Sequence, residues 1–148
     1  MQKQELIKAC DDYFKNKINT LNLIISELTE SANSESKSSA GDKHETSKAM
    51  MQLEREKLGN QLKEGEEQLA EFEKINFNKN FQMIEQGCLI ETDKGYFFIA
   101  GSVGKMKVGD EFIFVISWKS PLARALEGKK NKDVVNFNGT AYEIISII

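Results

Sequence analysis

The sequence predicts an α+β protein, in which an antiparallel coiled-coil hairpin at the amino terminus precedes a small antiparallel β-sheet domain with one short helix. Two observations predict this fold. Apolar residues in the first half recur with the seven-residue period of paired helices, and the second half consists of short β-rich runs separated by turn residues. We place the hairpin at residues 1–78, with its tip near 34–46, and the sheet domain at residues 81–148.

The first helix is predicted from one apolar stripe between residues 4 and 32. Four of its members recur every seven residues and three others follow four residues later, which together give Ile7, Phe14, Ile18, Leu21, Ile25, Leu28 and Ala32. This spacing places them on one side of a helix. Asp11 lies on an inner row of this helix and weakens the apolar seam.

A second stripe begins near residue 44 and consists of Met51, Leu58, Leu62, Leu69 and Phe72. Neither helix has a second apolar face, so each is expected to bury its stripe against the other. The connecting segment SANSESKSSAG is long enough only for a reversal of direction. Gly65 lies on an inner row of the second helix, and we therefore expect the hairpin to need support from the second half of the chain.

Charge and hydropathy exclude several classes of protein. Residues 1–80 carry 12 basic and 15 acidic side chains and residues 81–148 carry 8 of each, so neither half has the excess of cations typical of direct nucleic-acid binding. No apolar run approaches the roughly 20 residues that span a bilayer, and the amino terminus lacks the apolar core of a signal peptide. Cys10 and Cys88 have no metal-site spacing and are expected to be reduced and buried. These features predict a cytoplasmic protein without a membrane partner.

Five β-rich runs fill the second half, and turn residues separate them at Asp93-Lys-Gly95, Val108-Gly-Asp110 and Asn138-Gly139. The Asn-Gly pair predicts a tight hairpin between the last two strands. The segment SPLARALEGKK predicts a short helix, because Ser120 suits the cap, Pro121 the first helical position and Gly128 the residue after the end.

The segment Gly41-Asp42-Lys43-His44-Glu45 lies where the two helical stripes meet. Asp42 and Glu45 are three residues apart at a helix start, so they would project from one side of it. One interpretation is a capping box, in which Asp42 accepts a hydrogen bond from the backbone of residue 45 and Glu45 reaches back. The other is a pair of hard oxygen ligands for a magnesium ion.

This arrangement resembles the Gre-type bacterial transcript cleavage factors over nearly the whole chain. In that family an amino-terminal coiled coil carries a G-D-x-x-E-N-A-[DE]-Y pattern at its tip, which residues 41–49 match in part. The family's carboxy-terminal domain is FKBP-like and has a helix that begins S-P-[IL]-[AG]-[RK]-x-[LI], followed by G-K and D-V-V. Here these are residues 120–126, Gly128-Lys129 and Asp133-Val134-Val135.

The resemblance implies a transcription elongation factor with no independent enzymatic activity and no small-molecule substrate. Its partner would be RNA polymerase, which the coiled coil would enter through the secondary channel. Contact with nascent RNA and DNA would be indirect, through the polymerase. Asp42 and Glu45 would be the catalytic residues and would hold a Mg²⁺ ion shared with the polymerase active site, which stimulates cleavage of backtracked RNA. Ser120, Pro121 and Arg124 would bind the polymerase.

The tip departs from the family pattern at four positions, with Thr46 for Asn, Ser47 for Ala, Lys48 for an acid and Ala49 for an aromatic residue. Lys48 lies about one turn from Glu45 and would pair with it or repel Mg²⁺. The alternative is therefore a secondary-channel regulator that docks on the polymerase without stimulating cleavage. A third and weaker hypothesis is an isomerase or chaperone with a helical dimerisation arm.

Overall fold

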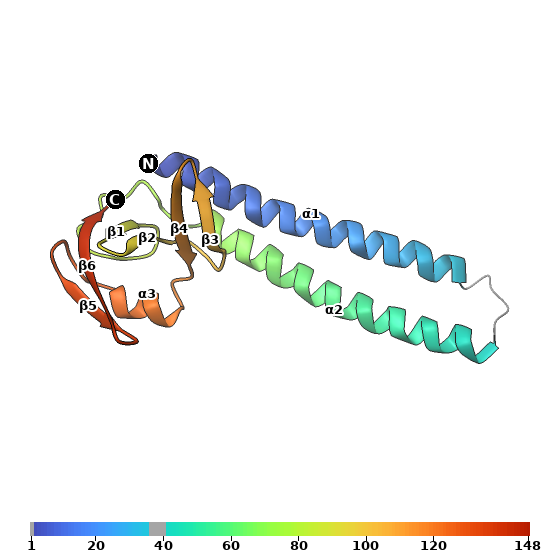
Figure 1. The fold of residues 1–148 in the computed structure, drawn as a ribbon. Coiled ribbons are helices and arrows are strands. Elements are labelled where there is room, and N and C mark those ends of the chain that lie inside the picture. The colour runs from blue at the N-terminus through green and yellow to red at the C-terminus, as the bar shows by residue number, and fades with distance from the viewer. Residues whose placement is uncertain (1, 36–40) are drawn as a thin grey trace. The chain divides into compact units, whose positions relative to one another are not determined.

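A computed structural model describes the backbone of residues 2–35 and 41–148, and the side chains within those ranges except at 32, 34, 35 and 41–44. Helix α1 (Lys3–Glu35) and helix α2 (Gly41–Glu73) precede six strands and a short third helix (Figure 1). Contacts divide the chain into two units. Residues 12–69 form a helical pair, and residues 1–11 join residues 70–148 in a unit that contains the sheet. The predicted α+β fold is confirmed.

The helical pair is antiparallel (Figure 1). A Cβ atom added to Gly65 would lie 3.5 Å from Cγ1 of Ile18, which places these two residues at one level. Counting outward from this level with the heptad spacing pairs Leu21 with Leu62 and Ile25 with Leu58. Leu21 and Leu58 are buried and Ile25 and Leu62 are half-buried, as the sequence stripes predict.

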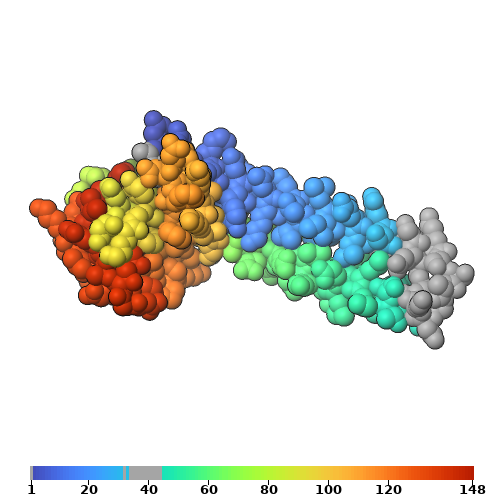
Figure 2. Space-filling model, in the orientation of Figure 1, coloured from blue at the N-terminus to red at the C-terminus, as the bar shows by residue number. Residues whose placement is uncertain are grey.

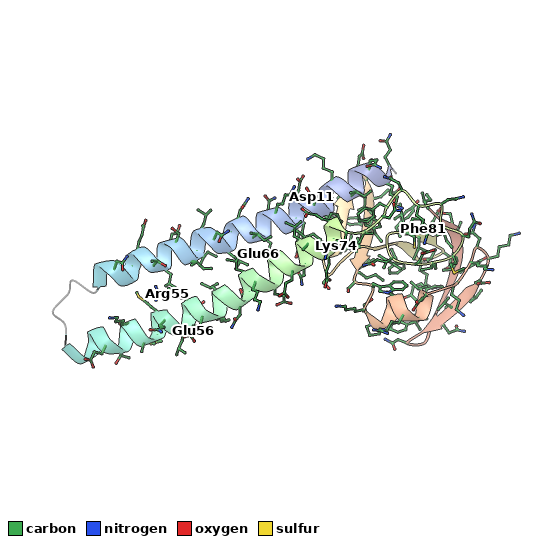
Figure 3. The ribbon with its side chains drawn as sticks, turned by 180° about the vertical axis from the view of Figure 1, so that it is seen from behind. Asp11, Arg55, Glu56, Glu66, Lys74 and Phe81 are labelled. Atoms are coloured by element: carbon green, nitrogen blue, oxygen red, sulfur yellow. The ribbon has the colours of Figure 1, made fainter. Side chains whose placement is uncertain are left out.

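Two polar residues interrupt this seam. Arg55 is half-buried on the side of α2 towards α1, whereas its neighbour Glu56 is exposed on the other side (Figure 3). The side-chain oxygen Oε1 of Gln68 is buried and accepts no hydrogen bond from the described residues. Because a buried polar group without a partner costs free energy, the seam is weaker than a fully apolar one.

The sheet contains the strands β1 (Leu89–Thr92), β2 (Gly95–Ile99), β3 (Gly104–Val108), β4 (Glu111–Ile116), β5 (Val134–Phe137) and β6 (Thr140–Ile147). Their order is β3-β4-β2-β1-β6-β5. One pairing departs from the predicted antiparallel sheet, because β2 and β4 run parallel. The unpredicted strand β3 lies outside β4 and carries the chain back to a parallel position beside β2, so the sheet is mixed.

Each face of the sheet is packed differently. On one face, Phe97 and Ile99 join a core that includes Ile90, Ile144 and the helix α3 (Pro121–Leu126). On the opposite face, Phe98 lies against Phe77, with ring centroids 5.5 Å apart. On that face the thiol of Cys10 lies 3.7 Å from the sulfur of Met106. Strand β2 is thus buried on both sides, which explains its central place.

The ends of the chain are joined within the same unit. Nζ of Lys3 donates to the backbone oxygens of Phe77, at 2.9 Å, and Ile148, at 2.8 Å, and lies 4.5 Å from the centre of the Phe81 ring. Burial lowers the pKa of Lys3 to about 8. Among the described helices, none combines the length and apolar character needed to cross a membrane.

Candidate functional site

The predicted catalytic pair lies at the amino end of α2. The helix begins at Gly41, so residue 42 is in its first turn and Glu45 is one turn further along. The Glu45 side chain is exposed. The side chain of Asp42, and with it the choice between a cap and a metal ligand, falls outside the described residues.

The amino end of α2 extends beyond the end of α1. With Ile18 level with Gly65, the last residue of α1, Glu35, is level with residue 48, so residues 41–47 pass the described end of α1 (Figure 1). At about 1.5 Å per residue, this overhang is about 10 Å long. Glu45 therefore stands on a helical segment that has no described α1 residue beside it.

The residues that follow Glu45 are also open to solvent. Lys48 and Ala49 are exposed, and Ser47 is half-buried. Lys48 is three residues after Glu45, so both side chains lie on neighbouring positions of the helix surface. The start of α2 therefore presents both a negative charge, on Glu45, and a positive charge, on Lys48, whereas the Gre-type pattern has only acids here.

Magnesium in proteins is bound by oxygen ligands and usually keeps several waters. The exposed carboxylate of Glu45 fits one such ligand. Within the residues that the structure describes, no three His, Cys, Asp or Glu side chains gather to hold a metal ion. The described part of the tip thus offers one exposed carboxylate, that of Glu45.

The second predicted site is the start of α3. Oγ of Ser120 accepts a hydrogen bond from the backbone N–H of Ala123 at 3.2 Å, and Pro121 occupies the first helical position. Gly128 follows the helix with φ +77°, a left-handed conformation that favours glycine. The predicted cap, first turn and helix end are confirmed, and Ser120 is held by this structural role.

Pro121 and Arg124 are exposed on the same short helix. Nε of Arg124 donates to the backbone oxygen of Lys119 at 3.3 Å, which directs the guanidinium along the loop before the helix. Of the three predicted partner-binding residues, Pro121 and Arg124 are thus available for contact, while the hydroxyl of Ser120 is engaged within the protein.

A shallow cavity of about 280 Å³ lies beside this helix start and was missed by the sequence prediction. Its lining residues are polar or amphipathic: Glu71, Lys74, Gln86, Ser117, Trp118 and Lys119. Nζ of Lys119 lies 3.8 Å from Oε1 of Glu71. In the sequence, the only hint of this cavity is the pair Trp118-Lys119 directly before Ser120. A tryptophan is more simply interpreted as a core residue, so the pair did not mark a surface site. This pair and the nearby Pro121 and Arg124, of which Arg124 donates to the backbone of Lys119, form a candidate docking region.

No protein-family model and no curated protein matches the chain, so these comparisons assign it to no family.

Proposed function

We propose that this chain is a Gre-like transcription elongation factor of the bacterial cytoplasm. It binds RNA polymerase through its FKBP-like sheet domain, and its helical pair enters the secondary channel. There it stimulates the polymerase's own cleavage of nascent RNA in backtracked complexes. The observation that carries this proposal is the overhang of α2, which presents the exposed carboxylate of Glu45 beyond the end of α1.

The chemistry of two-metal phosphodiester cleavage supports this choice. The reaction needs hard oxygen ligands that hold Mg²⁺ near the attacking and leaving oxygens. Asp42 and Glu45 would supply two of these ligands, and the remaining ones would come from the polymerase. A partial ligand set on an exposed helix end suits a factor that has no activity by itself.

The geometry of the α3 start supports docking by the same domain. Ser120 caps the helix, so Pro121 and Arg124 are held at defined positions beside the cavity that Trp118 and Lys119 line. Aromatic and arginine side chains in such a setting are typical of protein contacts with high binding energy.

A second candidate function is favoured by Lys48, which is exposed one turn from Glu45. Its ammonium group lowers the local affinity for a divalent cation. The chain would then occupy the secondary channel and regulate initiation or substrate entry without stimulating cleavage.

The deciding experiment uses a backtracked elongation complex with end-labelled RNA and Mg²⁺. Wild type is compared with Asp42→Ala/Glu45→Ala and with the control Glu54→Ala/Glu56→Ala, which removes two exposed carboxylates elsewhere on α2. The cleavage proposal expects wild type and the control to shorten the RNA and the tip variant to bind without shortening it.

If wild type binds the polymerase and leaves the RNA intact, the regulator is the correct function. In that case Lys48→Asp, which restores the acid of the family pattern, measures whether the lysine alone suppresses cleavage. If wild type does not bind the polymerase, both proposals are wrong.

A further inference from the structure

Strands β3 and β4 form an exposed aromatic and basic surface that the sequence composition conceals. Phe112 and Phe114 on β4 are 50% and 42% exposed, which is unusual for side chains of this size. The strand register places Lys107 beside Phe112 and Lys105 beside Phe114. Atoms of these strands, in orange, reach the surface in Figure 2.

The lysines and the aromatic rings share one face of the sheet. Nζ of Lys105 lies 4.5 Å and Nζ of Lys107 lies 5.6 Å from the centre of the Phe112 ring. The residues between them in sequence, Met106 and Ile113, pair on the opposite face. Because successive side chains of a strand alternate between faces, this surface has a repeat of one ring and one cation every two residues.

Glu111 on β4 and Glu91 on β1 lie on the other face. Glu111 is two residues before Ile113 and therefore shares its face, and Glu91 pairs with Tyr96, which pairs with Ile113. Partial burial and then the charges of Glu91 and Glu111 raise the pKa of Tyr96, which places both acids near its hydroxyl. Around β3 and β4, the two lysines thus lie on one face of the sheet and these two acids on the other.

The aromatic surface continues across the sheet. The ring of Phe97 is stacked on that of Phe114, with centroids 5.8 Å apart, and meets Tyr142 edge-on at 5.7 Å. Nζ of Lys94 lies 6.0 Å from the centre of the Tyr142 ring. Phe97 is buried and stacks on Phe114, so the ring of Phe114 has an aromatic neighbour beneath it.

We infer that this face binds single-stranded nucleic acid, with bases stacked on Phe112 and Phe114 and the backbone phosphates paired with Lys105 and Lys107. Two same-face residues of a strand are about 6.6 Å apart, a spacing that allows one nucleotide of an extended strand at each ring. Base stacking on aromatic side chains beside a basic track is the general mode of such binding. An acidic protein partner would use the lysines but has no need of flat rings.

The inference is independent of the proposed function, and its test needs no polymerase. Fluorescein-labelled single-stranded RNA and DNA 12-mers of one mixed sequence, and the duplex of the DNA 12-mer with its complement, are titrated with the full chain, and binding is followed by anisotropy. We expect both single strands to bind, because stacking and phosphate pairing do not read the 2′-hydroxyl, and the duplex to bind at least tenfold more weakly.

Two variants separate stacking from charge. Phe112→Leu/Phe114→Leu keeps apolar side chains but removes the rings, and it should weaken binding at least tenfold, since each stacked base contributes a factor of about 5 to 150. Lys105→Gln/Lys107→Gln should reduce the slope of log affinity against log salt by about 1.4, or about 0.7 for each phosphate that no longer pairs with a lysine.

Matched controls alter the same residue types elsewhere. Val134→Ala/Ile145→Ala removes apolar side chains that are 58% and 49% exposed, and Lys129→Gln/Lys130→Gln removes two exposed lysines. Both should bind within twofold of wild type.

Four results would overturn the inference. The first three are the absence of binding by wild type at 100-fold molar excess of protein, unchanged affinity of the Phe→Leu variant, and equal competition by polyglutamate, which would indicate an acidic protein partner. The fourth is that Lys105→Gln/Lys107→Gln only increases self-association, which would mean that the lysines protect the edge strand β3 and bind no nucleic acid.

Discussion

Gly65 faces Ile18 across the helical pair, where an added Cβ atom would lie 3.5 Å from Cγ1 of Ile18. This distance is an ordinary van der Waals contact, so the site accepts a methyl group. We expect Gly65→Ala to raise the free energy of unfolding by about 1 to 2 kcal/mol, through better helix propensity and added apolar burial. Urea unfolding followed by helical circular dichroism measures the change.

Gly59 provides the control for this substitution. It lies in the same helix, is exposed, and an added Cβ atom would meet nothing within 4 Å. Gly59→Ala should therefore gain only the helix-propensity part, about 1 kcal/mol. A loss of stability in Gly65→Ala would show that the two helices pack closer in solution than this register allows.

Gly87 is expected to behave in the opposite way. Its φ of +98° lies in the left-handed region, and an added Cβ atom would come within 2.8 Å of Cγ2 of Ile75 and 3.1 Å of the backbone oxygen of Asn76. Gly87→Ala should lower the free energy of unfolding by roughly 3 kcal/mol, because backbone strain and overpacking add. Thermal unfolding of the full chain tests this expectation.

Gly109 separates strain from overpacking. It also has a positive φ, of +61°, but an added Cβ atom meets no neighbour. Gly109→Ala should cost about 1 kcal/mol, the strain alone. Equal losses at both positions would mean that the surroundings of Gly87 move aside.

The start of α3 separates a structural role from a binding role. Ser120→Ala removes the acceptor for the backbone N–H of Ala123 and should cost about 1 kcal/mol, whereas Ser120→Asp keeps an acceptor and most of the stability. Arg124→Ala changes an exposed side chain and should alter stability by less than about 0.5 kcal/mol. Thermal unfolding and polymerase binding are measured for all three.

Under the proposed function, Arg124→Ala weakens polymerase binding while the protein stays folded, and Ser120→Asp binds like wild type. Polymerase binding that falls with Ser120→Asp at unchanged stability would assign the hydroxyl itself to the interface.

Local rules predicted much of this fold. The Asn138-Gly139 hairpin formed as expected, because both residues adopt positive φ angles of 50° and 78°, which the tight turn requires. Ser120, Pro121 and Gly128 marked the limits of α3 for similar reasons. The stripe positions Leu21 and Leu58 are buried because heptad spacing directly determines which residues two helices share.

Features that depend on distant contacts were missed. Strand β3 reads GKMKV, in which only Met106 and Val108 are apolar, so its sequence resembles a loop until β4 is placed beside it. The parallel pairing of β2 with β4 follows from that same strand. The first turn of α1 buries Leu6 at 0% exposure, and not Ile7, because the helix end packs within the sheet unit and leaves the heptad pattern of the arm.

The candidate site was predicted unevenly for a related reason. Motif residues such as Glu45 and Arg124 are recognised by their position in the sequence. The surface formed by Lys105 and Phe112 was not recognised, because net charge averages over both faces of a sheet while strand alternation separates them.

The two cysteines should be unreactive in the folded protein. Burial raises the pKa of the Cys10 thiol to about 12, and burial is also the main cause that raises the pKa of Cys88 to about 11. Since the thiolate is the reactive form, both thiols should resist a disulfide reagent at pH 8 and react rapidly, two per chain, in denaturant. Fast labelling of Cys10 or Cys88 without denaturant would mean that the sheet unit opens.

The same shifts predict a loss of stability in alkali. Between the ordinary cysteine pKa of 9.0 and about 11, the unfolded chain releases the Cys88 proton while the folded chain retains it. Stability from this group is therefore complete below pH 9 and declines as pH rises towards 11, by on the order of 2 kcal/mol.

Lys3 opposes this trend, because its lowered pKa means that the folded chain releases a proton above about pH 8 while the unfolded chain keeps it. Comparing wild type with Cys88→Ala in urea unfolding at pH 8 and pH 10.5 measures the contribution of Cys88 together with its charge interaction with Lys3. The difference between the two proteins should shift with pH in favour of Cys88→Ala, and a constant difference would show that the Cys88 thiol titrates equally in both states.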